Sequence, residues 1–361
     1  MTRLPPWLAD LPFWPEHLKA LSHQGLPIVL YGMGNGADKI IDILQEYGVP
    51  VSGIFASDDF VRDKVFRGFK VERYRDLKAR FGQMAVVVAF ATQLSEIMLR
   101  IDDIAIEQTL IYPDLPVFGG GLVTPAYLAE HADAILAAHD AFADERSRRV
   151  FRGLLRFKLT GDLRELRPIT SPRREVFSSL IPLTDKEHYL DLGAYNGDTI
   201  REFLRHAQKG HYASITAVEP AQKNFQNLSA WVEEEGLPGC TPVNAAVSDV
   251  CGTLSFSGKS GRAACLGEGK QTVEVTTVDA LLSGRPVTYV KMDVEGEEAP
   301  TLRGMAGTLA AAKPKLSVSA YHRLADLWEL PALIRSLRSD YKIYLRKHDY
   351  YPGWESVIYA H

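Results

Sequence analysis

The sequence predicts an α/β protein with two doubly wound domains, each a mostly parallel sheet with helices on both faces. Two series of short apolar runs alternate with amphipathic, helix-like stretches, one starting at Ile28 and the other at His188. A glycine turn follows the first apolar run of each series, at 32–37 and at 193–197. Near the C-terminus, residues 342–345 and 355–359 alternate apolar and polar side chains, which predicts an antiparallel hairpin that closes the second sheet. Residues 242–246 predict the third strand of that sheet, and 254–256 with 272–276 predict an inserted hairpin around a glycine-rich loop.

The composition is that of an ordinary soluble globular protein. The 361 residues are 46% hydrophobic and 24% charged, with a formal net charge of -4 and no basic stripe, which argues against a nucleic-acid partner. The three cysteines (Cys240, Cys251 and Cys265) have no Cys-x-x-Cys spacing, so neither a zinc motif nor a disulfide framework is expected. The residues after residue 7 do not form the apolar core of a signal peptide, and no apolar run is long enough to span a membrane. We therefore expect a cytoplasmic protein, either a monomer or a homodimer.

Changes in composition divide the chain into four parts. Aromatic residues and prolines mark the first part, and three glycines at 119–121 precede an alanine-rich helical stretch. Prolines from Pro168 onward interrupt the helical pattern before the second α/β series begins. The predicted parts are an N-terminal leader (1–24), a Rossmann-like α/β domain (25–118), a helical connector (119–167) and a second Rossmann-like α/β domain (168–361).

The first glycine turn resembles a nucleotide-binding turn. It fits the pattern Gly-x-Gly-x-x-Ala directly after a buried strand, and an acidic residue follows at about the 20-residue distance typical of dinucleotide sites. The candidate residues are Gly32, Gly34, Gly36 and Asp58. They support an alternative function, either an NAD(P)-dependent oxidoreductase or a nucleotide-sugar-binding protein. The same glycines also fit a turn that closes a Rossmann-like unit and binds nothing.

The second glycine turn has a different chemistry. Asp191 interrupts the apolar run, and Gly193 and Gly197 then lead into a helix, so the backbone can approach a nucleotide-like ligand closely. The turn has no Gly-x-x-x-x-Gly-Lys-Ser/Thr pattern, which argues against a triphosphate site. An acidic glycine turn suits a ligand that carries a cationic amino acid and a ribose, as S-adenosylmethionine does. Such a turn can also simply close a βα unit.

Polar residues end five successive strands of the second domain. Because ligands of such sheets bind beyond the carboxyl ends of the strands, these side chains form the predicted site. Glu219, at the end of the second strand, is placed to accept both hydroxyls of a ribose. The five positions also argue against a module that only docks a protein partner. They are Asp191, Glu219, Ser248 with Asp249, Asp293 with Glu295, and His322.

Six segments of the second domain together resemble the FkbM family of S-adenosylmethionine-dependent methyltransferases, over about residues 170–361. They are Tyr189-Leu-Asp-Leu-Gly-Ala-Tyr-Asn-Gly-Asp-Thr199, Val218-Glu-Pro220, Asn244-Ala-Ala-Val-Ser-Asp249, Thr277-Val-Asp279, Lys291-Met-Asp-Val-Glu-Gly-Glu-Glu298 and Ser319-Ala-Tyr-His322. The resemblance implies a class I methyltransferase fold and methyl transfer from S-adenosylmethionine to a hydroxyl oxygen of a sugar, glycolipid, polyketide or similar metabolite.

The resemblance also implies roles for single residues. Asp191, Gly193, Gly197 and Glu219 would hold the cofactor, and Asp249, preceded by Ser248, would lie near the adenine. Tyr195 stands where the family often has asparagine, and the neighbouring Asn196 is the candidate to supply the missing amide. We expect an O-methyltransferase whose N-terminal domain helps to present the acceptor.

A hydroxyl is a poor nucleophile at neutral pH, so a base that takes its proton is expected. The candidates are His322, Asp293 and Glu295. His322 is favoured because its unperturbed pKa lies near neutrality, and Asp293 is the alternative base. We expect no metal, although two carboxylates and an imidazole are also a plausible ligand set for a divalent ion. The loop at 258–269 and the connector are expected to shape the acceptor pocket.

Overall fold

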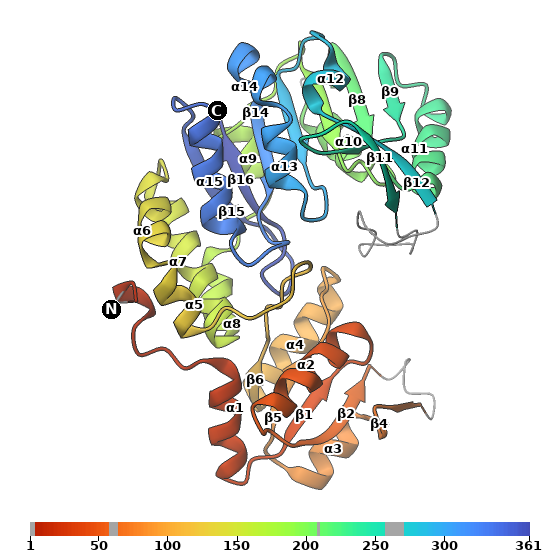
Figure 1. Ribbon diagram of the computed structural model, residues 1–361. Coiled ribbons are helices and arrows are strands. Elements are labelled where there is room, and N and C mark those ends of the chain that lie inside the picture. Colours follow the sequence, from red (N-terminus) through yellow and green to blue (C-terminus); the bar gives the residue numbers. More distant parts are fainter. Residues whose placement is uncertain (1–3, 58–63, 208–209, 257–270) are drawn as a thin grey trace.

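The computed structural model describes residues 4–57, 64–207, 210–256 and 271–361. Two α/β parts are joined by a helical segment, and the carboxyl ends of the N-terminal strands face the C-terminal part (Figure 1). Asp58 and the predicted pocket loop 258–269 lie outside the described residues.

The N-terminal sheet has the strand order β3-β4-β2-β1-β5-β6. All neighbours are parallel except β3 and β4, which are antiparallel. The central strands β1 and β5 are fully buried, which explains why both are uninterrupted apolar runs. The strands are β1 (Ile28–Tyr31), β2 (Val51–Ala56), β3 (Val65–Phe66), β4 (Phe69–Arg73), β5 (Ala85–Val88) and β6 (Thr109–Ile111), and the helices between them are α2 (Asn35–Glu46), α3 (Tyr74–Phe81) and α4 (Ser95–Glu107).

The C-terminal sheet has the order β15-β16-β14-β13-β7-β8-β9. Strand β16 pairs antiparallel with both β14 and β15, so the predicted antiparallel hairpin is confirmed. The strands are β7 (His188–Leu192), β8 (Ser214–Val218), β9 (Cys240–Val243), β13 (Tyr289–Met292), β14 (Lys315–Ser319), β15 (Ile343–Lys347) and β16 (Ser356–Ala360). The helices are α10 (Asp198–His206), α11 (Gln222–Glu234), α12 (Val278–Leu282), α13 (Glu298–Arg303), α14 (Ala306–Ala312) and α15 (Asp326–Leu337).

The predicted third strand of this domain, 242–246, is divided in the structure. Strand β9 ends at Val243, and β10 (Ala246–Val247) belongs to a separate three-stranded sheet of order β10-β12-β11. Asn244, between them, donates from Nδ2 to the carbonyl oxygens of Glu219 (2.8 Å) and Pro220 (3.1 Å), which fixes the chain where it leaves the main sheet. The predicted inserted hairpin is confirmed as antiparallel strands β11 (Gly252–Phe256) and β12 (Gln271–Thr276).

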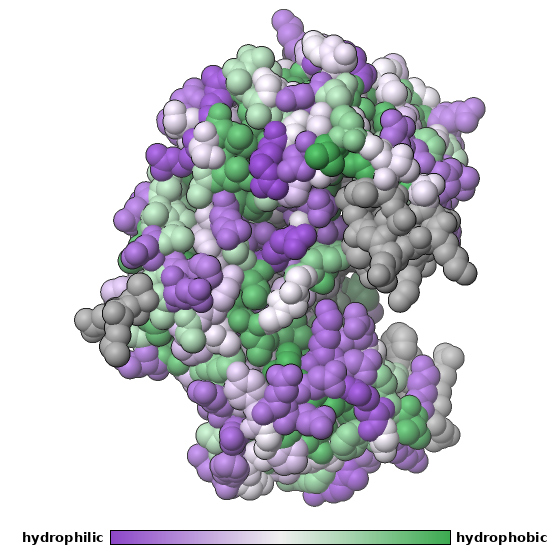
Figure 2. Space-filling view, viewed as in Figure 1, coloured by the Kyte–Doolittle hydropathy of each residue, from purple (hydrophilic) through white to green (hydrophobic). Residues whose placement is uncertain are grey.

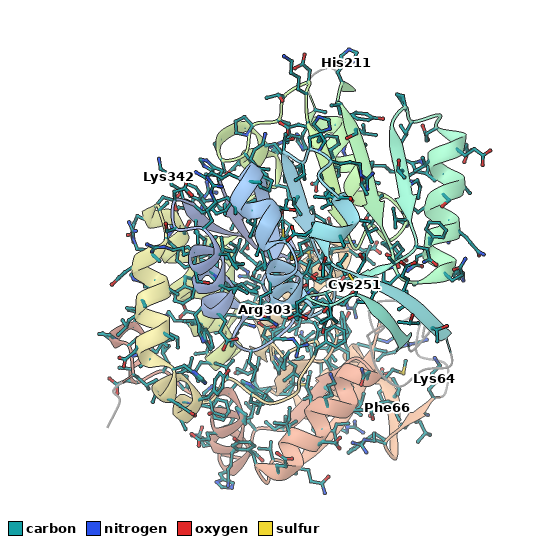
Figure 3. All side chains as sticks on the ribbon, turned by 45° about the horizontal axis from the view of Figure 1, so that its top comes forward. Lys64, Phe66, His211, Cys251, Arg303 and Lys342 are labelled. Carbon is teal, nitrogen blue, oxygen red and sulfur yellow. The ribbon has the colours of Figure 1, made fainter. Side chains whose placement is uncertain are left out.

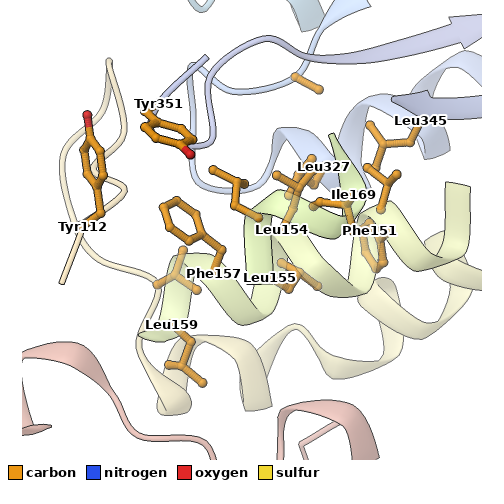
Figure 4. Packing of buried hydrophobic residues seen from close by; sticks show 14 of the residues in the cluster. Tyr112, Phe151, Leu154, Leu155, Phe157, Leu159, Ile169, Leu327, Leu345 and Tyr351 are labelled. Atoms are coloured by element: carbon orange, nitrogen blue, oxygen red, sulfur yellow. The ribbon is translucent and has the colours of Figure 1, made fainter. Parts of the chain in front are cut away.

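The predicted helical connector consists of short helices around the long helix α7 (Glu145–Thr160). Side chains of α7 such as Leu154 and Phe157 pack in one cluster with Leu327 of α15 and Leu345 of β15 (Figure 4). The same continuous core reaches the strands of the N-terminal sheet, so it fixes the two sheets relative to each other. The other elements here are η1 (Pro6–Leu8), α1 (Trp14–His23), α5 (Pro125–Glu130), α6 (Ala132–Ala141), α8 (Leu163–Leu166), η3 (Arg167–Ile169) and α9 (Arg174–Ser179).

Helix α7 also covers the edge strand β15 through polar contacts. The buried Oγ of Ser147 accepts hydrogen bonds from the backbone nitrogen of Leu345 (2.9 Å) and from Nη1 of Arg346 (2.8 Å). Asp144, the N-cap of α7, pairs with Arg346 at 2.6 Å. These contacts satisfy an edge strand that would otherwise offer unpaired backbone groups.

Among the described residues, no helix has the length and apolar character needed to span a bilayer.

Replacing Ser147 with alanine should destabilise the protein. The variant leaves a buried N–H of Leu345 without a partner and removes one of the three acceptors of Nη1 of Arg346, which costs about 1–3 kcal/mol of unfolding free energy. Urea denaturation of Ser147→Ala measures this loss. The control is Ser336→Ala on the exposed face of α15, which should change stability by less than ~0.5 kcal/mol. Equal effects in the two variants would contradict the prediction.

Candidate active site

A cavity of about 810 Å³ opens at the carboxyl ends of the C-terminal strands. A notch between the two lobes is visible on the right of Figure 2. The turns after β7, β8 and β13 contribute to the cavity wall, and residues between 93 and 119 line it from the N-terminal part of the chain. The residues that line the cavity include Gln93, Phe118, Gly119, Gly193, Tyr195, Asn196, Glu219, Lys291, Asp293, Glu295 and Tyr321.

The turn after β7 requires its glycines. Gly193 has φ 80°, and a Cβ there would lie 1.9 Å from the carbonyl oxygen of Asp293. Gly197 has φ 83°, and its Cβ would lie 2.5 Å from the ring of Trp231. Both positions exclude a side chain by backbone conformation and by space. The turn therefore packs tightly on β13 and α11, and it presents Gly193, Tyr195 and Asn196 to the cavity while Gly197 is buried.

Asp191 lies one layer behind this turn. It is fully buried and does not line the cavity. Its carboxylate lies 3.3 Å from Nζ of Lys291 and accepts a hydrogen bond from Oγ1 of Thr199 at 2.5 Å. Lys291 also donates to the carbonyl oxygen of Gly193 at 2.8 Å. Burial raises the pKa of Asp191, and the charge of Lys291 opposes this rise. Through their contacts with Thr199 and Gly193, the two side chains connect β7 and β13 with the glycine turn and the start of α10.

Glu219 occupies the predicted position after β8 and lines the cavity. Its carboxylate accepts hydrogen bonds from the backbone nitrogens of Tyr195 and Ala221, both at 2.9 Å, and from Nδ2 of Asn224 at 3.3 Å. Burial raises its pKa, although these donors favour the charged form. A buried carboxylate still has lone pairs for further donors, which suits the recognition of hydroxyl groups.

Ser248 and Asp249 lie outside the cavity wall, contrary to the expectation that Asp249 would lie near the adenine. The residues that line the cavity here are the three before them, 245–247. Because β10 pairs with β12 rather than with the main sheet, the chain turns away after Val247. Asp249 instead accepts a hydrogen bond at 2.9 Å from Nε of Arg303, which Figure 3 labels on α13.

His322 is the centre of a buried group of carboxylates. Its Nε2 lies 3.4 Å from Oδ1 of Asp293 and 3.4 Å from Oε2 of Glu295, and its Nδ1 lies 2.9 Å from Oε1 of Glu298. Burial would lower the pKa of His322, but Glu298, followed by Asp293 and Glu295, raises this pKa to about 10. His322 is 1% exposed and does not line the cavity, whereas Asp293 and Glu295 do.

This geometry changes the assignment of the base. A histidine that is already protonated at neutral pH has no free lone pair for the proton of an acceptor, and the carboxylates stand between His322 and the cavity. Burial raises the pKa of Asp293, but Lys291 and then His322 lower it, so the net shift is downward and the carboxylate is ionised. The favoured prediction, His322, thus fits worse than its alternative, Asp293.

Glu298, Tyr321 and Lys291 belong to the site in the structure but were not among the predicted site residues. Glu298 begins α13, and its Oε1 accepts a hydrogen bond from the backbone nitrogen of Val294 at 3.0 Å, which closes the turn after β13. Tyr321 donates its hydroxyl to Oδ1 of Asp293 at 3.2 Å. Both residues lie in segments that resemble the FkbM family. The available signals were the position of Glu298 at the end of the acidic segment 291–298 and the position of Tyr321 directly before His322.

The N-terminal glycine turn is explained by packing. A Cβ on Gly32 would lie 2.7 Å from the ring of Phe90, and one on Gly36 would lie 2.3 Å from the carbonyl oxygen of Ala89. Gly34 is exposed with no neighbour within 4 Å. The cavity of about 810 Å³ does not include this turn. A nucleotide site at Gly32, Gly34, Gly36 and Asp58 stays a prediction.

Residues 191–350 match the sequence profile of the methyltransferase FkbM domain. The C-terminal domain belongs to the FkbM methyltransferase family. The methyltransferase FkbM of Methylobacillus flagellatus KT has a similar structure, with a TM-score of 0.75 at 18% identity over 99% of this chain and 95% of that chain. The predicted family and the predicted methyltransferase fold are confirmed.

Other solved structures match only part of the chain. A SAM-dependent methyltransferase from Aquifex aeolicus has a TM-score of 0.33 at 11% identity and covers 55% of this chain and 97% of its own. Aeropyrum pernix fibrillarin, solved with S-adenosyl-L-methionine bound, has a TM-score of 0.34 at 12% identity over 52% of this chain and 73% of its own. No curated protein matches the sequence.

The FkbM methyltransferase domain identifies the protein as an S-adenosylmethionine-dependent methyltransferase, as predicted. The site fits this cofactor on three observations. The backbone turn at Gly193 lines the cavity, a buried carboxylate at Glu219 offers acceptors, and the cavity of about 810 Å³ is ample for a nucleoside-sized ligand.

The contact of Gly193 with β13 can be tested by substitution. Gly193→Ala places a methyl group 1.9 Å from a backbone oxygen in a left-handed conformation, so the turn must move. We expect a loss of about 2 kcal/mol or more in unfolding free energy and at least tenfold weaker binding of S-adenosylhomocysteine, measured by urea denaturation and calorimetric titration. The control Gly252→Ala has open space around its Cβ and should leave binding unchanged. Wild-type binding by Gly193→Ala would disprove the role of this contact.

Proposed function

We propose that this enzyme transfers the methyl group of S-adenosylmethionine to a hydroxyl oxygen of a sugar, glycan or secondary metabolite. The observation that carries the proposal is the carboxylate of Asp293, which lies on the cavity wall and is kept ionised by Lys291 and His322. In the transfer an oxygen–carbon bond forms, the sulfonium–carbon bond breaks, and the hydroxyl proton passes to a base. A hydroxyl acceptor needs such a base, and Asp293 is suitably placed for it.

Glu219 is our proposed acceptor for the ribose hydroxyls of the cofactor. It lies at the end of the strand next to β7, and its carboxylate is oriented by the backbone nitrogens of Tyr195 and Ala221. The turn through Gly193 and Asn196 would hold the amino-acid end of the cofactor. Asp191 would act by position, because its contacts with Lys291 and Thr199 support this turn from behind.

Asp293 is our proposed base, with Glu295 beside it as a second polar group for the acceptor. Tyr321 donates to Asp293, and His322 lies behind both carboxylates. His322 would therefore act as a positioning residue that orients Asp293 rather than as the group that receives the proton. The enclosed site aligns the acceptor with the sulfonium and limits competing water.

The N-terminal half would hold the remainder of the acceptor. Gln93, from the loop after β5, and Phe118 and Gly119, from the connector, line the same cavity as Asp293. The loop after β5 is tied to the C-terminal domain by two backbone hydrogen bonds between Thr92 and Tyr351, both 2.8 Å. This bridge keeps Gln93 at the cavity and supports a role of the N-terminal domain in presenting the acceptor.

The cofactor role of Glu219 predicts a binding defect in Glu219→Gln. The glutamine amide brings a donor group against the backbone donors of Tyr195 or Ala221 and removes a charge-assisted acceptor. S-adenosylhomocysteine should bind at least tenfold more weakly, a loss of ~1.4 kcal/mol or more, in isothermal titration. Glu234→Gln, an exposed change on α11, is the control and should bind like the wild type. Unchanged affinity in Glu219→Gln would rule the role out.

Transfer to a hydroxyl group predicts that a labelled methyl group is found on an oxygen atom of the acceptor. S-adenosylmethionine labelled with ¹³C in its methyl group is incubated with the protein and a panel of free sugars, nucleotide sugars, glycolipids and polyketide alcohols. The chemical shift of the transferred methyl distinguishes an oxygen from a nitrogen or carbon attachment, and stability to alkali distinguishes an ether from an ester. A methyl ether supports the proposal, whereas a methyl ester, or a methyl on nitrogen or carbon, overturns it.

Asp293→Asn should separate binding from catalysis. Without a base, the transfer rate should fall by about 10² or more, while S-adenosylhomocysteine binds within about threefold of the wild type. Asp185→Asn, on an exposed turn, is the control for general effects of removing a carboxylate. Full transfer activity in Asp293→Asn would assign the base to another group.

A further inference from the structure

Three side chains around His322 have the arrangement of metal ligands. Asp293 and Glu298 flank the turn between β13 and α13, and His322 follows β14. One candidate ligand atom from each of the three lies within 4.8 Å of the other two. An ion with tetrahedral bonds of about 2.0–2.2 Å holds its ligand atoms roughly 3.3–3.6 Å apart, so on binding the side chains move inward by up to about 1.5 Å.

Two buried atoms of this group have unused bonding capacity. Oε2 of Glu298 and Nδ1 of His322 have no hydrogen-bond partner among the described residues, and each residue is 1% exposed. Nδ1 lies 2.9 Å from Oε1 of Glu298, but this contact lacks the alignment of a hydrogen bond. Nδ1 is ion-paired with Glu298, but Oε2 of Glu298 has free lone pairs in a buried position, where polar atoms are almost always satisfied, and such an oxygen is suited to bind a cation.

The charge around the imidazole points to a cation. Besides Asp293 and Glu298, Glu295 lies 3.4 Å from Nε2 of His322, and the buried Asp326 lies next to the cluster, with one oxygen accepting from the backbone nitrogen of Arg323. Lys291, a buried amine whose charge acts on Asp293, already contacts Asp191 and the carbonyl of Gly193. Excess negative charge in a buried site is costly unless a cation neutralises it.

We propose that Asp293, Glu298 and His322 bind one divalent transition-metal ion such as Mn²⁺ or Zn²⁺. A set of carboxylate oxygens with one imidazole nitrogen suits these ions, whereas Mg²⁺ favours oxygen ligands alone. Asp293 and Glu295 also line the cavity, so the ion lies behind the wall that faces the acceptor. Binding of the ion displaces the proton that the surrounding carboxylates otherwise hold on His322, and the ion then fixes the carboxylate of Asp293. The ligand set differs from the sequence-based alternative, which had Glu295 in place of Glu298.

The test uses the full chain after treatment with a chelator and dialysis. Mn²⁺ is titrated and followed by electron paramagnetic resonance and by calorimetry, with one ion per chain as the expected stoichiometry. Glu298→Gln should weaken Mn²⁺ binding at least tenfold, while the control Glu329→Gln, an exposed acidic position on α15, should bind like the wild type. Titration with S-adenosylhomocysteine shows whether Glu298→Gln is folded.

A second measurement covers the case in which Glu298→Gln does not fold. Pulsed electron paramagnetic resonance of Mn²⁺ bound to the wild-type protein should detect coupling to an imidazole nitrogen. Substoichiometric binding, equal binding by Glu298→Gln and the wild type, or a bound ion without nitrogen coupling would each overturn the site. The readout needs no acceptor, so a failure of metal binding and a failure of hydroxyl methylation are distinguished directly.

Discussion

The active site depends on one close contact, between the glycine turn after β7 and the end of β13. At Gly193 the two backbone segments approach so closely that a single Cβ would overlap the carbonyl oxygen of Asp293. This contact sets the distance between the glycine turn and the carboxylate of Asp293, which are proposed to face the cofactor and the acceptor respectively. The buried pair of Asp191 and Lys291 fixes the same junction from below, because these two residues are register partners on adjacent strands.

Lys291 connects the two halves of the site electrostatically. Its amine contacts Asp191 and the carbonyl of Gly193 on the cofactor side, and it lowers the pKa of Asp293 on the acceptor side. A buried cation shared in this way keeps both carboxylates compatible with burial. The charge that Lys291 does not balance lies around His322, where the carboxylates of Asp293, Glu295 and Glu298 converge.

The sequence predicted the features that depend on local pattern. Buried parallel strands read as apolar runs, so both sheets, the inserted hairpin and the terminal hairpin were predicted, as was the position of Glu219 at a strand end. Side-chain direction depends on neighbouring strands that the local pattern does not contain. For this reason Asp191 and His322 lie behind the wall, Asp249 faces Arg303, and the role of Glu298 was missed. The division of the third strand likewise depends on Asn244 bonding across to the end of β8.

The shared core explains why the N-terminal half contributes to a site whose chemistry lies in the other half. Helix α7 packs on β15 and belongs to the same cluster as the N-terminal strands, so the two sheets are held with their carboxyl ends toward one cavity. The backbone bridge between Thr92 and Tyr351 then places Gln93 within that cavity. The glycines of the N-terminal turn serve this arrangement, since Gly36 packs against Ala89 at the start of the same loop. The packing of Gly36 thus supports a loop that reaches the methyltransferase cavity, whereas the predicted nucleotide site at this turn stays a prediction.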